Sequence, residues 1–147
     1  MHSAWGPYAE TVLRFPEVKL AIDLRLPLPA AIPKRLSQLG LTGSFGVVTA
    51  CNPRGITLDA GANRRLTAEL AAVVRERYPA ARLAQGESPD GRHEEAGWAI
   101  AAPLPELKRL AAEFRQNALF WFDGVRFVIV PVLGQGPPLP LPAARPR

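Results

Sequence analysis

Polar side chains that can bind a ligand follow directly on a run of apolar residues near position 45. The stretch "FGVVTACNPRG" begins as a buried strand would and then turns polar at Thr49, Asn52 and Pro53. A hydroxyl and a carboxamide supply donors and acceptors to a polar ligand. Ligands in open α/β sheets bind outside the carboxyl ends of strands, where loops and helix N-termini meet. The pattern therefore favours a binding site at this sheet edge.

A second carboxamide, Asn63, lies in the first turn of the helix expected over residues 60–78. It precedes Leu66 by three residues and so continues the apolar stripe of that helix. Packing of the helix on the preceding strand then aims Asn63 toward Asn52. The first turn, which includes Arg64, also offers free N–H groups to an anion. The alternative is that Asn52 opens a turn and Asn63 caps local backbone.

The loop "QGESPDGRHEEAG" carries acidic residues between two expected strands. Alternation places Glu94 on the same face as Trp98 and Glu95 on the other, so at most one of the two points inward. A carboxylate that enters the domain there can hold a ligand or act as a general base, and Glu95 is the only candidate base. The alternative is an exposed acidic loop.

Gln116 and Asn117 join an expected helix to an expected central strand. Asn tolerates the left-handed conformation in which many helices end, so Asn117 is also explained as a helix C-cap. Gln116 has no comparable local role, and its side chain faces either the same sheet edge or water.

Several kinds of site are excluded by what the sequence lacks. Cys51 is the only cysteine, so neither a disulfide nor a thiolate metal site forms within the chain. His93 has no partner histidine at metal-ligand spacing, and we expect no metal site. No phosphate-binding loop, dinucleotide turn, serine elbow or metalloprotease helix occurs, so no motif specifies a cofactor.

The composition is that of an ordinary globular protein. The 147 residues are 48% hydrophobic and 21% charged, with a net charge of +5. The basic residues are scattered rather than clustered, so nucleic acid is only a secondary candidate partner. The start of the sequence has no secretory signal pattern and no apolar run is long enough to cross a bilayer, so a soluble, cytoplasmic protein without membrane contact is expected.

The periodicity predicts a single α/β or α+β domain over residues 1–133, with helices packed on one mixed sheet of about six strands. Expected elements include a short helix from Pro7 to Leu13, an edge strand over 17–26 and a C-terminal hairpin with a two-residue turn at Asp123-Gly124. Residues 134–147 are Pro-rich and are expected to form a flexible tail.

Four segments, in order, resemble a family of small bacterial and phage proteins of uncharacterised role, domain-of-unknown-function family 3293. They are "VTACNPRG", Asn63 with "RRLTAEL", "DGRHEEAGWAI" and "FRQNALFWFDG". The family pattern has Thr-Ala-x-Asn-Pro, a helix that opens with Asn, a Glu before a strand, and Phe-Gly-Gln-Asn-Ala. The resemblance extends from about residue 44 to 130, and Arg115 stands where the family has glycine. The site residues that it implies are Thr49, Asn52, Pro53, Asn63, Glu95 or Glu94, Gln116 and Asn117.

The resemblance implies no activity, and two functions therefore remain in competition. The first is a pocket at the carboxyl edge of the sheet that binds a small polar or anionic, nucleotide-like molecule, with or without catalysis by Glu95. The second is an interaction module that holds a protein or nucleic acid through its basic surface and Pro-rich tail. If the polar residues serve only turns, the protein acts within a complex. The sequence specifies no oligomeric state.

Overall fold

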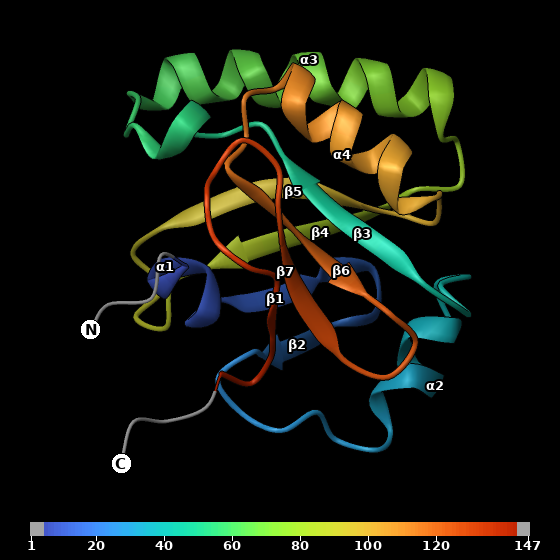
Figure 1. Ribbon diagram of the computed structural model, residues 1–147. Coiled ribbons are helices and arrows are strands. Elements are labelled where there is room, and N and C mark those ends of the chain that lie inside the picture. The colour runs from blue at the N-terminus through green and yellow to red at the C-terminus, as the bar shows by residue number, and fades with distance from the viewer. Residues whose placement is uncertain (1–4, 144–147) are drawn as a thin grey trace.

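Eight β-strands form one curled sheet in the computed structural model, which describes residues 5–143 (Figure 1). The strands are β1 (Val12–Phe15), β2 (Leu20–Asp23), β3 (Phe45–Thr49), β4 (Arg82–Glu87), β5 (Glu94–Ile100), β6 (Ala118–Phe122), β7 (Phe127–Pro131) and β8 (Leu139–Pro140). Their order in the sheet is β2-β1-β4-β5-β3-β6-β7-β8. The helices are α1 (Gly6–Ala9), α2 (Ile32–Ser37), α3 (Ala60–Arg77) and α4 (Leu104–Glu113).

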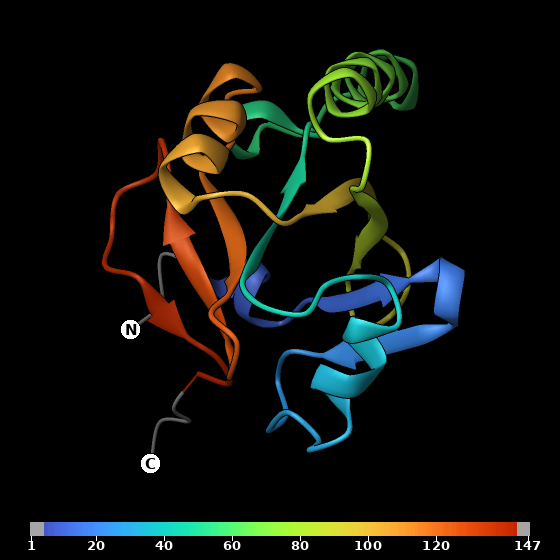
Figure 2. The same ribbon diagram turned by 90° about the vertical axis from the view of Figure 1, so that its right-hand side faces the viewer.

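Each face of the sheet has its own hydrophobic core, because successive side chains of a strand point to opposite faces. The concave core contains Phe15, Phe45 and Phe127 and is closed at one end by α2. The convex core lies under α3 and α4 and contains Leu70 and Leu107 (Figure 2). The central strand β3 is covered on both faces, as its unbroken apolar run predicted.

The predicted combination of one sheet with packed helices is confirmed, but the sheet differs from expectation in two respects. It has eight strands instead of about six, and every pairing within residues 5–143 is antiparallel. Strand direction has no signature in a single sequence, because both directions bury the same apolar residues. The antiparallel arrangement brings the C-terminal end of β3 beside the N-terminal ends of β5 and β6.

The N-terminal segment is more extended than predicted. The first helix ends at Ala9 rather than near Leu13, and residues 12–15 form β1 between β2 and β4. Leu13 and Phe15 alternate into the concave core, so ladder pairing on both sides outweighs the weak helical spacing. The edge position predicted for the strand within 17–26 is confirmed, since β2 ends the sheet.

The C-terminal hairpin is confirmed, with its turn shifted by one residue. The backbone N–H of Asp123 donates to the carbonyl of Arg126 at 3.1 Å, which leaves Gly124 and Val125 between them. The Asp123 carboxylate accepts from the backbone N–H groups of Val125 and Arg126, both at 2.8 Å. This side-chain capping favours the shifted turn.

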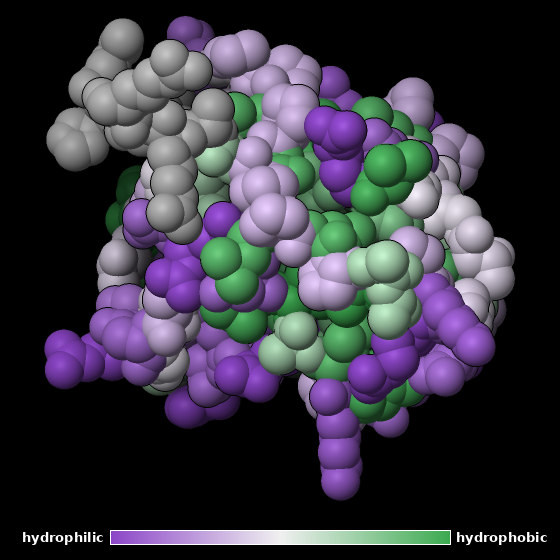
Figure 3. All heavy atoms as spheres, turned by 90° about the horizontal axis from the view of Figure 1, so that it is seen from below, coloured by the Kyte–Doolittle hydropathy of each residue, from purple (hydrophilic) through white to green (hydrophobic). Residues whose placement is uncertain are grey.

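Part of the Pro-rich segment lies on the fold instead of forming a flexible tail. Leu139–Pro140 forms β8 beside β7, and Leu141 is buried in the concave core. Apolar burial thus fixes a segment whose prolines weaken its hydrogen bonding. Figure 3 shows apolar side chains gathered on the face opposite α3 and α4. Residues 144–147 of the predicted tail lie outside the described residues.

Helix α4 ends in a Schellman motif whose left-handed position is occupied by Arg115. The N–H of Gln116 donates to the carbonyl of Ala111 at 3.0 Å, and that of Arg115 to Ala112 at 3.0 Å. Arg115 has φ +55°, so the prediction that Asn117 provides the left-handed cap is wrong. The left-handed residue is the one that stands where the family pattern has glycine.

We expect Arg115→Gly to stabilise the fold by about 1 kcal/mol, because a side chain raises the energy of the left-handed conformation. Urea denaturation measures the change. Lys108→Gly is the matched control, since Lys108 is exposed within α4 and this change should destabilise the fold by about 1 kcal/mol. Equal destabilisation by both variants would contradict a strained Arg115.

Candidate functional site

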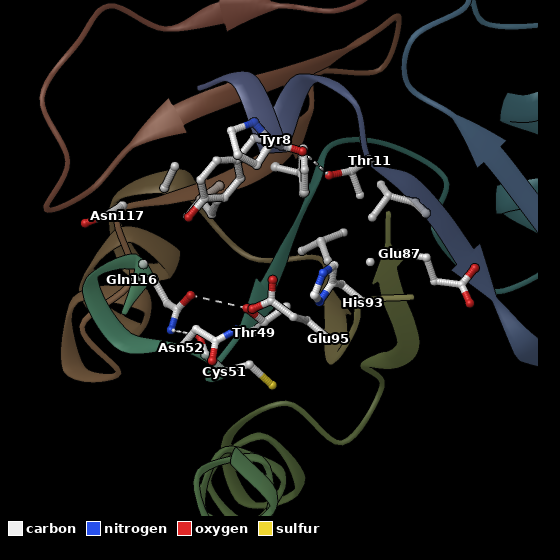
Figure 4. Close-up of a pocket in the computed structure, with 18 residues that line it drawn as sticks. Tyr8, Thr11, Thr49, Cys51, Asn52, Glu87, His93, Glu95, Gln116 and Asn117 are labelled. Atoms are coloured by element: carbon white, nitrogen blue, oxygen red, sulfur yellow. Dashed lines mark hydrogen bonds between the residues drawn. The ribbon is translucent and has the colours of Figure 1, made fainter. Parts of the chain in front are cut away.

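A cavity of about 330 Å³ opens at the end of the concave face, where β3 ends and β5 and β6 begin (Figure 4). Because the sheet is antiparallel, this edge combines both kinds of strand end and is not a carboxyl edge as predicted. Its lining consists of Pro7, Tyr8, Thr11, Leu13, Val47, Thr49, Cys51, Asn52, Gly55, Gly86, Glu87, His93, Glu95, Gln116, Asn117, Ala118, Leu119 and Phe120.

The cavity exists because side chains on the concave face become smaller or polar toward this end. Along β3, Phe45 and Val47 fill the core and Thr49, two residues later, reaches the cavity. Along β6, the side chain on the same face likewise becomes smaller, from Phe120 to Ala118 two residues earlier. The hollow is therefore a continuation of the concave core in which large apolar side chains are missing.

Gln116 fixes the floor of the cavity. The residue is only 5% exposed, and its Nε2 donates to the carbonyls of Cys51 and Phe114, both at 3.1 Å. Its Oε1 accepts from the Thr49 hydroxyl at 3.2 Å. Gln116 thus lines the cavity, as predicted, while its donors and its acceptor bind the ends of α4 and β3.

The predicted approach of the two carboxamides is confirmed, but they bind each other. Asn63 Nδ2 donates to Asn52 Oδ1 at 2.9 Å, and the Asn52 backbone N–H donates to Asn63 Oδ1 at 2.9 Å. Asn52 Oδ1 also accepts from the Leu58 N–H at 3.0 Å. Asn52 lines the cavity and Asn63 does not, so Asn63 holds the loop through its neighbour.

The expected anion site at the start of α3 is already capped by the protein. The Asp59 carboxylate accepts from the Ala62 N–H at 2.8 Å, and it places negative charge at the helix N-terminus. Arg64 is exposed, and neither Arg64 nor Pro53 lines the cavity. No Lys or Arg is among the described lining residues, which leaves the anionic part of the predicted ligand without a counter-charge.

Glu95 reaches into the cavity, and Glu94 is exposed on the other face, in agreement with the predicted alternation. Burial raises the pKa of Glu95, and the nearby His93 opposes this rise. No described residue forms a hydrogen bond or an ion pair with its carboxylate. The other acidic lining residue, Glu87, is paired with Arg14. Glu95 is therefore the one lining carboxylate of the described chain that is without a protein partner.

Asn117 lies on the rim rather than at the centre of the cavity. Its backbone carbonyl accepts from the N–H groups of Val132 and Gly134, at 2.8 and 2.9 Å. A Cβ added to Gly55 would lie 3.2 Å from Asn117 Nδ2, so the glycine permits this close approach. Gly55 has φ +75°, which also favours glycine.

Tyr8 and Thr11 were not predicted as lining residues. They come from α1 and the turn after it. The Tyr8 ring packs edge-on against the Phe120 ring, with 5.8 Å between the ring centroids. Burial, followed by the charge of Glu95, raises the pKa of Tyr8 to about 12, while the Ala118 backbone N–H opposes the rise. The phenol thus stays protonated at neutral pH. Only the tertiary fold brings this segment close to Glu95, and no local sequence motif predicts that Tyr8 and Thr11 line the cavity.

The Cys51 thiol also lines the cavity. Cys51 is buried, which raises the pKa of its thiol, and its sulfur lies 3.6 Å from the Thr67 hydroxyl. Within residues 5–143, no three side chains of His, Cys, Asp or Glu are placed as a metal site requires. Nor does that part of the chain contain a helix that is long and apolar enough to cross a bilayer.

We expect Asn63→Ala to lower the free energy of unfolding by about 1–2 kcal/mol, because the Asn52 N–H and carboxamide each lose a partner. Thermal or urea unfolding measures the loss. Arg64→Ala, one residue further and exposed, is the matched control and should change stability little. Equal effects of the two changes would be inconsistent with a structural role of the Asn52–Asn63 pair.

The raised pKa of Glu95 predicts a pH-dependent stability. The folded state holds the Glu95 proton more tightly than the unfolded chain, so this stabilisation is complete below the usual pKa of 4.5 and is lost as pH rises through the raised value. Glu95→Gln stays neutral and should become more stable than the wild type over that range. Each tenfold difference in proton affinity corresponds to about 1.4 kcal/mol.

Urea denaturation of both proteins between pH 4 and pH 8 measures this difference. Glu94→Gln, the same change at the exposed neighbouring position, is the matched control. A similar stability gain in both variants, or none in Glu95→Gln, would show that Glu95 is well solvated.

Comparison with known proteins identifies a family but no activity. No curated protein and no solved structure matches the chain. The family described as "Protein of unknown function (DUF3293)" matches residues 48–119, which run from the end of β3 through α3, β4, β5 and α4 to the start of β6. This segment supplies Thr49, Asn52, Glu95, Gln116 and Asn117, whereas Tyr8 lies outside it. Over residues 48–119 the chain therefore matches this family, which is the one that the four sequence motifs resemble.

Proposed function

We propose that the protein binds a small, polar, uncharged or cationic molecule in the cavity, with Glu95 as its main hydrogen-bond acceptor. The observation that carries this proposal is the half-buried Glu95 carboxylate, which has no protein partner among the described residues. A carboxylate withdrawn from water without compensation destabilises a fold. A ligand that donates hydrogen bonds to it supplies that compensation.

The size and lining of the cavity support a single small molecule. Binding cavities for small molecules typically measure about 300–1,000 Å³, with apolar walls and a few polar groups. At about 330 Å³, this one suits a ring with short substituents better than a complete dinucleotide. Leu13, Val47 and Phe120 supply apolar wall, and Tyr8 and Thr49 supply hydroxyl groups.

The charges of the lining oppose the anionic ligand that the sequence suggested. Glu87 and Glu95 are the acidic residues of the lining, and no Lys or Arg is among its described residues. Glu87 is already paired with Arg14 at the edge of the cavity. A phosphate placed here would meet negative charge in a partly desolvated space, which raises its energy. Of the small polar or anionic ligands that the sequence suggested, we therefore retain the polar molecules without negative charge.

Mass spectrometry of small molecules that co-purify with the native protein tests the proposal. We expect a defined molecule with wild-type protein and with Glu94→Gln, and at least a tenfold lower occupancy with Glu95→Gln. Because Glu95→Gln should be the more stable protein, such a loss is not explained by unfolding. Equal occupancy in all three proteins, or no bound molecule in any of them, would argue against a ligand held by Glu95.

A further inference from the structure

The hydrogen bonds around the cavity fix the direction of its polar groups. Asn52 Oδ1 accepts from the Leu58 N–H and from Asn63 Nδ2, which occupies both of its lone pairs. The backbone donor of Leu58 identifies this atom as oxygen. The NH₂ group of Asn52 is on the other side of the carboxamide carbon, and no described residue accepts a hydrogen bond from it. Asn52 therefore presents a donor, and no acceptor, to the cavity.

Thr49, in contrast to Asn52, presents a hydrogen-bond acceptor to the cavity. Gln116 Nε2 donates to two backbone carbonyls, so Gln116 Oε1 is its only group that can pair with the Thr49 hydroxyl. The hydroxyl proton of Thr49 is thus committed to Gln116. What remains for a ligand is the lone pairs of Thr49 Oγ1, which act as an acceptor.

Glu95 adds a second acceptor beside Thr49. It lies two residues before Gly97, the cross-strand partner of Thr49, and so shares the concave face with Thr49. Figure 4 shows the side chains of Glu95, Thr49 and Asn52 facing the same part of the cavity. One donor and two acceptors therefore converge there from three different segments of the chain.

The complementary ligand edge has an acceptor next to a donor. From this pattern, and on the basis of the proposed function, we infer that the cavity recognises a flat ring bearing an amide edge, that is, a C=O beside an N–H, as in a primary carboxamide or a heterocyclic lactam. The C=O accepts from Asn52, and the N–H donates to Glu95 or Thr49. The ring lies against the wall that Tyr8 and Phe120 form together, since these two side chains pack edge-on with ring centroids 5.8 Å apart.

Other polar edges leave one of these groups unpaired. An amidinium pairs with Glu95 but turns a donor toward the Asn52 NH₂. A carboxylate satisfies Asn52 but sets negative charge against Glu95. An N-alkylated lactam keeps the C=O and lacks the N–H. Because a desolvated group without a partner typically weakens binding by roughly 10-fold to 100-fold, these compounds discriminate among the possible edges.

Three probes of the same ring and shape test the inference: benzamide, benzamidine and benzoate. A second pair is 2-pyridone and N-methyl-2-pyridone. Dissociation constants come from chemical-shift titration of the full-length protein. We expect benzamide and 2-pyridone to bind at least tenfold more tightly than the other three compounds, and Glu95→Gln to weaken both.

Asn52→Asp is the decisive variant, because the carboxylate keeps the oxygen that binds Leu58 and Asn63 and replaces only the NH₂. Asp also tolerates the left-handed conformation that this position adopts, with φ +47°. We expect benzamide to lose at least tenfold in affinity and benzamidine to gain. The melting temperature of the variant verifies that the fold is intact. Arg64→Ala, exposed and outside the cavity, lowers the net charge by one as Asn52→Asp does and is a control that should not reverse the preference.

The outcomes separate this inference from the proposed function. Glu95-dependent binding of benzamidine without binding of the amides would overturn the amide edge and leave the cavity as a binding site. Failure of all five probes, with a Glu95-dependent molecule still co-purifying, would likewise overturn only the amide edge. If no probe binds and no molecule co-purifies, both proposals fail. Unchanged preference in Asn52→Asp would overturn the assigned role of Asn52.

Discussion

The need to pair every buried polar group determines how this end of the protein is built. No buried side-chain nitrogen or oxygen among residues 5–143 lacks a hydrogen-bond partner. Asn63 and Gln116 satisfy this constraint by binding the loop after β3 and the end of β3 itself. In doing so they commit one side of Asn52 and the proton of Thr49 to the protein. The Asn52 NH₂ group and the lone pairs of Thr49 Oγ1 remain unpaired among the described residues and face the cavity together with Glu95. The hydrogen bonds of Asn63 and Gln116 therefore determine which donors and acceptors the cavity presents.

Sequence periodicity predicts the positions of several site residues. It does not predict that the N-terminal segment forms one wall of the cavity. Helical spacing placed Asn63 toward Asn52, and strand alternation separated Glu95 from Glu94. Both rules act within one element and its direct neighbour, where a single sequence is informative. Tyr8 reaches the cavity only because β1 pairs with β4, a contact between distant parts of the chain. Nor does a lone Asn reveal whether its carboxamide binds a ligand or another Asn.

The fold shows the same division. The apolar run of β3, the stripe of α3 and the hairpin after α4 were predictable, because each has its own pattern of apolar residues or turn residues. Strand direction and the pairing of β8 were not, since both depend on which distant segments meet. The left-handed Arg115 carries no signal of its own, because arginine is unfavourable there. Only the glycine of the family pattern pointed to that position.

The loop after β3 and the end of α4, which meet beside the cavity, combine several features that lower stability. Asn52, Arg54 and Arg115 all have positive φ without being glycine, and such residues typically cost about 1–3 kcal/mol each. Hydrogen bonds hold them in place: the Arg54 N–H donates to the Arg115 carbonyl at 2.7 Å, and the Gly55 N–H to the Asn52 carbonyl at 2.8 Å. These hydrogen bonds hold the strained segment in place without any ligand. Since ordering a loop on binding weakens affinity, a segment that is already held by hydrogen bonds suits the proposed binding of a small molecule that itself offers few contacts.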